Sequence, residues 1–241
     1  MEDKIKLFYD IIQSNNRIVF FGGAGVSTES GIPDFRSVDG LYHQEYDYPP
    51  ETILSHSFFI RNTSEFYRFY HHKMIYADAA PNTTHLALAK LEKEGKLSAV
   101  ITQNIDGLHQ AGGSKNVFEL HGSVHRNYCQ KCHAFFDLSY IRNAQGIPVC
   151  NRCGGTIKPD VVLYEEGLDD TVVEGAISHI RNADCLIIGG TSLAVYPAAG
   201  FIDYFRGDKL IIINKTPSPR DSMADLVIHA SLGEVFGKMN K

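Results

Sequence analysis

The fold is decided by the stretch Gly22-Gly23-Ala24-Gly25-Val26-Ser27-Thr28-Glu29-Ser30-Gly31-Ile32-Pro33-Asp34-Phe35-Arg36, which directly follows the apolar run Ile18-Val19-Phe20-Phe21. An apolar strand followed by glycines predicts a turn in which the backbone approaches the phosphates of a dinucleotide. A long helix would ordinarily continue from such a turn. Here Gly31 and Pro33 end any helix almost at once and leave Asp34, Phe35 and Arg36 in a loop. This arrangement suits a cofactor that is cleaved and not merely bound.

Length, composition and charge set the outer limits on the fold and on the partners. The 241 residues are 44% hydrophobic, enough for one large domain or one domain with a small insertion. A net charge of -5 gives no general attraction to nucleic acid or to an anionic membrane. Neither a secretory signal pattern nor a membrane-spanning apolar segment is present in the sequence. We therefore expect a cytoplasmic protein that binds neither nucleic acid nor membrane.

Four of the five cysteines form two pairs with a metal-binding spacing, Cys129-x-x-Cys132 and Cys150-x-x-Cys153. Four thiolates complete a tetrahedral shell, so we predict one structural Zn²⁺ ion. Two disulfides or a redox pair would be the alternative, which a reducing cytosol disfavours. The nearby His125 and His133 could also be ligands, but four cysteines leave them unneeded. The fifth cysteine, Cys185, lies in an apolar run and is expected in the core.

Apolar runs alternate with helical patterns along most of the chain. Strands are predicted at 18–21, 98–102, 117–120, 161–164, 185–188, 210–213 and 226–228, and helices at 3–15, 85–94, 171–181 and 197–205, with a capping spacing at 231–234. This alternation predicts an α/β fold with a Rossmann-like parallel sheet covered on both faces. We assign residues 1–36, 81–123 and 159–241 to this Rossmann-like domain, which would bind the dinucleotide. The aromatic, helical insertion 37–80 and the zinc-binding module 124–158 are expected to form a smaller lobe.

Polar residues follow several of the predicted strands. Gln103-Asn104-Ile105-Asp106 follows the strand at 98–102, and His121 follows the strand at 117–120. Gly189-Gly190-Thr191-Ser192 and Asn214 come after two later strands. Each alone is typical of a turn. Because ligands bind beyond the carboxyl ends of parallel strands, their agreement predicts one shared site.

Taken together, the glycine run ending in Gly-Ile-Pro-Asp-Phe-Arg, the Gln-Asn-Ile-Asp and His-Gly motifs, the paired cysteines and Gly-Thr-Ser-Leu-x-Val-x-Pro-Ala closely resemble the sirtuin family of NAD-dependent protein deacylases. The resemblance covers nearly the whole chain. It implies that NAD is a co-substrate, and that the acetyl group of acetyl-lysine in a protein substrate is transferred to ADP-ribose. Nicotinamide and O-acetyl-ADP-ribose would be the other products. A monomer is the expected state.

The resemblance also implies roles for individual residues. His121 takes the catalytic position and activates a ribose hydroxyl, a task suited to an imidazole. Asn104 orders the ribose and a water, and Asp106 with the Ile105 backbone holds the nicotinamide carboxamide. The implied cofactor contacts are Gly23, Ala24, Gly25, Thr28, Phe35, Arg36, Gln103, Asn104, Ile105, Asp106, His121, Gly190, Thr191, Ser192, Asn214 and Leu232.

By the same resemblance, the acylated peptide adds as a strand between residues 161–166 and 190–196, touching Val162, Tyr164 and Val195. The family usually has Phe-Gly-Glu where this chain has Tyr164-Glu165-Glu166. We hypothesise that Glu165 places a negative charge beside the groove and favours basic peptides. Sirtuins that remove acidic acyl groups carry a Tyr and an Arg three residues apart, whereas this chain has Tyr70 and Lys73. We therefore expect acetyl or another neutral acyl group.

Two other functions fit parts of the sequence. An NAD-dependent protein ADP-ribosyltransferase, or a deacylase of another acyl group, would use the same site residues, and the mass of the product peptide separates these reactions. A non-catalytic NAD sensor or nucleic-acid-binding module would explain the cysteines but not His121. Nicotinamide release that requires acetyl-lysine and is lost in His121→Ala would decide for the enzyme.

Overall fold

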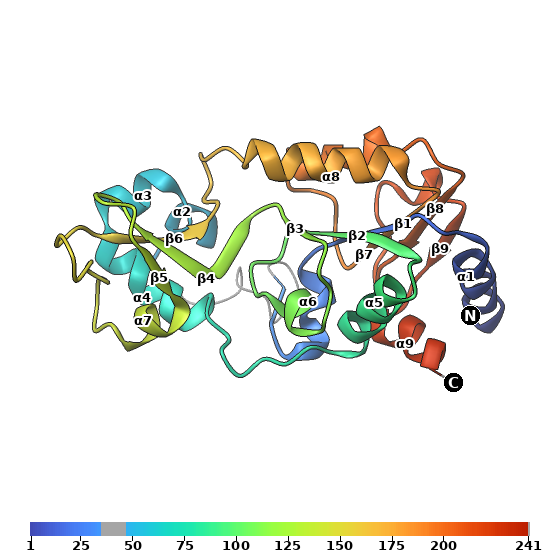
Figure 1. Ribbon diagram of the computed structural model, residues 1–241, viewed down its shortest axis with the longest axis horizontal. Helices are drawn as coiled ribbons and strands as arrows, with labels where there is room; N and C mark the ends of the chain where they lie inside the picture. The colour runs from blue at the N-terminus through green and yellow to red at the C-terminus, as the bar shows by residue number, and fades with distance from the viewer. Residues whose placement is uncertain (35–46, 241) are drawn as a thin grey trace.

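The computed structural model describes residues 1–34 and 47–240, which form two lobes lying end to end along the long axis of the molecule (Figure 1). Phe35 and Arg36, which the sequence predicts as cofactor contacts, lie outside the described residues. The larger lobe contains a six-stranded sheet and both chain ends. The smaller lobe contains a three-stranded sheet and several short helices.

All six strands of the large sheet are parallel, in the order β3-β2-β1-β7-β8-β9. The strands are β1 (Ile18–Gly22), β2 (Leu97–Thr102), β3 (Val117–Glu119), β7 (Cys185–Gly189), β8 (Lys209–Ile213) and β9 (Leu226–Ile228). Gly22 at the end of β1 pairs with Thr102 of β2 and with Gly189 of β7. The chain order therefore reverses around β1, which is where such sheets bind ligands. The predicted Rossmann-like parallel sheet is confirmed.

Helices cover both faces of this sheet (Figure 1). Phe20 and Val100 pack on the side of α1 (Glu2–Ser14), α5 (Thr83–Lys93) and α9 (Leu232–Phe236). Phe21 and Ile101 pack on the other side, against α8 (Asp170–Asn182) and the 3-10 helix η4 (Ala198–Tyr204). Two further 3-10 turns, η5 (Asp221–Met223) and η6 (Gly237–Asn240), lie near the C-terminus. No helix in the described part of the chain is long and apolar enough to span a bilayer.

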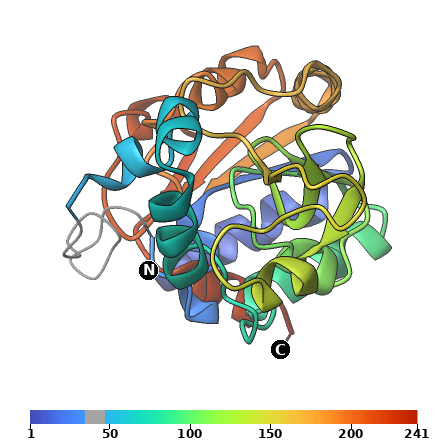
Figure 2. The same ribbon diagram turned by 90° about the vertical axis from the view of Figure 1, so that its left-hand side faces the viewer.

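The helical insertion and the cysteine-containing segment share one core in the smaller lobe. Figure 2 views the molecule from the end at which this lobe lies. The insertion contributes α2 (Pro50–Ile53), α3 (His56–Arg61) and α4 (Thr63–Lys73). The cysteine segment contributes α7 (Leu138–Asn143) and an antiparallel sheet in the order β5-β4-β6, from β4 (Gly122–Cys129), β5 (Phe135–Asp137) and β6 (Ile157–Val161). Tyr67 of α4 donates a hydrogen bond to Ile157 O. The two segments therefore fold as one lobe.

One predicted strand, at 161–164, is wrong. Val161 is the last residue of β6 and pairs with Gly122 in the small antiparallel sheet. Val162 N then donates to His121 O at 3.0 Å, and Leu163 is buried in the core of the smaller lobe. The apolar run has the composition of a buried parallel strand, but its partners belong to the other lobe.

Two histidines lie buried beneath the large sheet. The rings of His85 on α5 and His109 on α6 (Leu108–Ala111) have centroids 4.7 Å apart. His85 Nδ1 accepts from Asn82 N at 3.2 Å as part of the cap of α5. Neither ring nitrogen of His109 has a partner among the described residues. Burial, reinforced by His85, lowers the pKa of His109 to about 3.

We expect folding stability to fall between pH 7 and pH 5 because of His109. Its folded pKa lies below its unfolded value of 6.5, so its stabilising contribution is complete above pH 6.5 and is lost as the pH falls toward 3. The loss at pH 5 is about 2 kcal/mol. Urea unfolding at the two pH values should show this slope, reduced in His109→Leu and retained in the exposed control His72→Gln. An equal slope in both variants would contradict the assignment.

Candidate active site

The glycine run after β1 forms two short 3-10 turns, η1 (Ala24–Val26) and η2 (Thr28–Ser30), in place of a long helix. Gly31 has a φ of 83°, which ends the second turn at the predicted place. Gly25 N donates to Gly190 O at 2.8 Å, and a Cβ on Gly25 would lie 2.7 Å from Gly190 Cα. Gly190 itself has a φ of 62°. The loop after β1 and the loop after β7 therefore touch backbone to backbone.

Gly25→Ala should disturb this contact. The added methyl group would meet Gly190 backbone atoms and not a flexible side chain, so the two loops must separate. Overpacking of this kind costs about 1–3 kcal/mol of unfolding free energy. We expect urea unfolding to show that loss and NAD titration to show weaker binding. Gly167→Ala, where nothing lies within 4 Å, is the matched control, and equal behaviour of the two variants would argue against the close contact.

Side chains distant in sequence hold the glycine loop in place. Asn82 Nδ2 donates to Val26 O at 2.8 Å and to Ser30 Oγ at 3.0 Å. The Glu29 carboxylate accepts from Gly233 N at 2.8 Å and from Ser231 Oγ at 3.1 Å, which joins the loop to the start of α9. The side chain of Leu232, a predicted cofactor contact, is buried in the core there. Only its backbone remains for a ligand.

Gln103 and Thr191 meet across the end of the sheet. Thr191 Oγ1 donates to Gln103 Oε1 at 3.0 Å. The side-chain amide of Asn214 binds the Thr191 backbone: Oδ1 accepts from Thr191 N at 3.1 Å, and Nδ2 donates to Thr191 O at 3.0 Å. Asn214 is predicted as a ribose contact, but in the structure its side-chain amide binds the backbone of Thr191. Gln103 Nε2 is buried without a partner among the described residues. Such a donor is one that a bound ligand can satisfy, so this cradle fits a polar dinucleotide such as NAD.

Asp106, Asn104 and Ser27 form a second cluster beside the glycine loop. Ser27 Oγ donates to Asp106 Oδ2 at 2.6 Å and accepts from Asn104 Nδ2 at 3.0 Å. Leu108 N donates to Asp106 Oδ1 at 2.9 Å. No role was predicted for Ser27, although it lies inside the glycine run that follows β1. The only indication in the sequence was that Ser27 is a small polar residue in the loop predicted to bind the cofactor. Its partner Asp106 is predicted to belong to the same site.

His121 lies directly after β3, close to this cluster. Its Nδ1 is 3.0 Å from Gln103 O. A carbonyl oxygen only accepts, so Nδ1 carries the proton and the neutral ring offers its Nε2 lone pair. Burial lowers the pKa of His121, while the bond to Gln103 O opposes that shift. The imidazole is therefore neutral and able to accept a proton near neutral pH.

Val162, one of the predicted peptide contacts, lies beside His121, and several of the predicted contacts already make internal hydrogen bonds. Val162 N bonds to His121 O, and the exposed Tyr164 uses its backbone N and O on Leu54 and His56. Val195 is partly exposed in the loop after β7.

Glu165, which we hypothesise places a negative charge beside the peptide, is exposed and makes hydrogen bonds to α3. Its carboxylate accepts from Ser57 N at 2.9 Å and from Ser57 Oγ at 3.0 Å. Tyr70 is fully buried, and its hydroxyl has no partner in the described structure. Burial raises the pKa of Tyr70 well above its ordinary value, so this group stays neutral.

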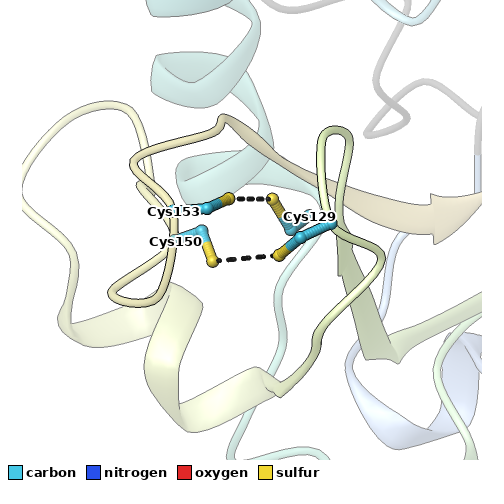
Figure 3. Close-up of side chains that lie close together, drawn as sticks. Cys129, Cys150 and Cys153 are labelled. Atoms are coloured by element: carbon cyan, nitrogen blue, oxygen red, sulfur yellow. Dashed lines mark hydrogen bonds between the residues drawn. The ribbon is translucent and has the colours of Figure 1, made fainter.

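The four paired cysteines point toward one another, as Figure 3 shows for Cys129, Cys150 and Cys153. Their sulfurs lie within 4.8 Å of one another, with Cys129–Cys153 at 3.4 Å and Cys132–Cys150 at 3.7 Å. All are free thiols. Tetrahedral Zn–S bonds of about 2.3 Å would place the sulfurs about 3.8 Å apart, so the four side chains fit one Zn²⁺ ion.

The backbone around the cysteines supports the same conclusion. Lys131 N and Arg152 N each lie 3.4 Å from the first sulfur of their pair, Cys129 and Cys150. These N–H groups stabilise thiolates, which is the state that binds metal. His125 is not in the cluster, because its Nε2 lies 3.0 Å from Asp106 O.

The comparisons agree with this geometry. The model of the Sir2 family matches residues 23–197. The chain belongs to the Sir2 family. An NAD-dependent protein deacetylase of Clostridium perfringens is 61% identical over 242 residues, 99% of either chain. A solved structure described as "Structural Basis for the Mechanism and Regulation of Sir2 Enzymes" has a TM-score of 0.90 at 41% identity over 99% of this chain and 97% of that one. Another Sir2 structure, with p53 peptide and NAD+, has a TM-score of 0.87 at 37% identity over 98% and 96%.

Proposed function

We propose that this Sir2 protein is an NAD-dependent protein lysine deacetylase that transfers the acetyl group of acetyl-lysine to ADP-ribose and releases nicotinamide. The observation that carries the proposal is the neutral His121, held through Nδ1 by Gln103 O at the carboxyl edge of the sheet. The name of the Clostridium perfringens relative and the Sir2 complex with peptide and NAD+ support the same reaction. Bound NAD supplies the ribose carbon that accepts the acyl oxygen when nicotinamide leaves.

Each polar cluster takes one part of this reaction. His121 Nε2 accepts the proton of a ribose hydroxyl, and Gln103 O keeps the ring oriented. Ser27 fixes Asp106 and Asn104, which would hold the nicotinamide end and order the ribose. The phosphates would lie over Ala24, Gly25 and Thr28, with Thr191 and Ser192 on the opposite side. Phe35 and Arg36 are proposed from the sequence resemblance alone.

On the protein substrate, Val162, Tyr164 and Val195 would border the peptide, whose backbone pairs as an added strand. The fully buried Tyr70 leaves no tyrosine–arginine pair for an acidic acyl group, so we propose acetyl as the acyl group removed. Protein ADP-ribosylation or another deacylation at the same site is the second candidate, because His121 and Asp106 would serve either reaction.

We further propose the division into an NAD-binding domain of residues 1–36, 81–123 and 159–241 and a smaller lobe of 37–80 and 124–158. The shared core of the smaller lobe supports it, although β4 and β6 both cross the boundaries. We propose a cytoplasmic monomer whose partners are acetylated proteins, with no nucleic-acid or membrane partner.

A nicotinamide-release assay tests the proposed function. We expect release only when NAD is incubated with an acetylated peptide, with the peptide losing its acetyl group in the mass spectrum. The unacetylated peptide serves as the control. A peptide that gains ADP-ribose would instead identify a transferase, and NAD binding without turnover would refute an enzyme.

A further inference from the structure

The turn at residues 163–166 follows directly on the backbone contact with the proposed catalytic histidine. Val162 N donates to His121 O at 3.0 Å, and Glu166 N closes the turn on Leu163 O at 3.0 Å. Glu165, the third residue of the turn, has a φ of 76°. Positive φ at this position favours glycine. A glutamate with this backbone conformation is strained, so an additional interaction is needed to offset the strain.

That interaction is with the start of α3. Glu165 Oε2 accepts from Ser57 N at 2.9 Å, and Oε1 accepts from Ser57 Oγ at 3.0 Å. One residue earlier in α3, His56 N donates to Tyr164 O at 3.0 Å. The first N–H groups of a helix lack partners within the helix. Two of them in α3 are satisfied by the turn, so turn and helix form one hydrogen-bonded unit.

The neighbouring Glu166 adds further contacts between the turn, α3 and β6. Its carboxylate lies 2.8 Å from His56 Nδ1 and 3.0 Å from Lys158 Nζ, and it accepts from Leu163 N at 2.9 Å. These bonds lower the pKa of Glu166 although its burial acts in the opposite direction. The Glu166 carboxylate is thus paired with the Lys158 cation, whereas the Glu165 carboxylate accepts only from the uncharged Ser57 and keeps its negative charge.

We propose that Glu165 is a positioning residue for the acylated peptide, because its carboxylate on Ser57 fixes the 163–166 turn to α3. The proposal rests on the deacetylase function proposed above. An edge that is already ordered loses less entropy when a peptide pairs with it. The effect of Glu165 should therefore appear in the KM for peptide, while kcat and the KM for NAD stay close to their wild-type values.

Three substitutions of Glu165 separate the anchor from the backbone strain. Glu165→Ala and Glu165→Gly remove the carboxylate, and we expect both to raise the peptide KM about five- to tenfold. Glu165→Gly should nevertheless unfold at a higher temperature than Glu165→Ala, because glycine accepts a φ of 76°. Glu165→Gln keeps an acceptor for Ser57 N and should restore most of the peptide affinity. The exposed Glu174→Gln on α8 controls for loss of charge.

A wild-type peptide KM in Glu165→Gly, or a KM that changes only in step with the unfolding temperature, would overturn the proposal. If the wild-type protein fails to deacetylate any peptide, the proposed function fails and so does the assignment to peptide binding. The anchor itself is tested separately by the unfolding temperatures of Glu165→Ala, Ser57→Ala and the double variant. Non-additive shifts confirm the contact, and additive shifts contradict it.

Discussion

Replacing His121 by alanine is expected to lower kcat/KM for NAD-dependent deacetylation by about 100- to 10,000-fold, the usual contribution of a general base. The physical reason is the fixed tautomer. Nδ1–H is bound to Gln103 O, so Nε2 is the nitrogen that can accept a proton. The glycine loop and the Gln103–Thr191 contact do not depend on the ring, and NAD binding should persist in His121→Ala. Initial rates of peptide deacetylation, measured at substrate concentrations below KM, give the loss in kcat/KM.

His179 provides a matched control for this substitution. It is also a histidine whose pKa is lowered by burial, but it lies on α8 near Ser98 and Asn116, at the amino ends of β2 and β3 and away from the carboxyl ends where the site lies. We expect His179→Gln to keep close to the wild-type rate. If both variants lost activity equally, the loss would reflect folding and not proton transfer.

The pH dependence of the wild-type enzyme extends the same prediction. Burial lowers the pKa of His121 below the ordinary histidine value of 6.5. The neutral form of the imidazole, which is the base, therefore persists to a lower pH than in a free histidine. We expect the acid-side decline of kcat/KM to have its midpoint below pH 6.5. A decline already centred above 6.5 would contradict the neutral, buried imidazole.

Removal of zinc is the second change with a large expected effect. Cys129 and Cys150 are part of the core of the smaller lobe, and β4, β5 and β6 form a sheet of only three strands. Metal binding supplies about 10–16 kcal/mol in small zinc domains, so losing the ion should unfold the part of this segment that carries the cysteines. We expect Cys150→Ser to lose the ion and the deacetylase activity, because the 163–166 turn also packs on this lobe. Metal analysis should give one zinc per wild-type chain.

Cys185→Ala is the control for the zinc prediction. Cys185 is buried in β7, and burial raises the pKa of its thiol to about 12, so it is not a metal ligand. The variant should keep one zinc ion. A wild-type protein that carries no zinc yet shows full activity would contradict a structural metal.

The large sheet and the metal cluster could be predicted because their signals are local. Continuous apolar runs mark strands buried on both faces, and two Cys-x-x-Cys pairs already fix four ligands. The prediction of a strand of the large sheet at 161–164 was wrong, because an apolar run does not indicate which hydrophobic core will bury it. Leu163 enters the core of the smaller lobe, a choice made by residues far away in the sequence.

The functional details that the sequence missed are likewise long-range contacts. Ser27 bonds to Asp106, 79 residues away, and has no distinctive spacing. The contact of Glu165 with Ser57 could not be predicted, because the two residues are 108 positions apart in the sequence. Asn214 was predicted to contact the ribose, but the structure shows that its amide also holds Thr191. Residue type indicates the available chemistry, whereas the folded partners decide how it is used.

The fate of the acetyl group tests the central claim most directly. An acetyl-lysine peptide labelled in its acetyl group should be incubated with NAD and the wild-type protein, and the early products separated by mass. We predict that the label appears on ADP-ribose, in equal amount to the nicotinamide released and the peptide deacetylated. Label found first in free acetate, or retained on a peptide that has gained ADP-ribose, would contradict acetyl transfer to NAD.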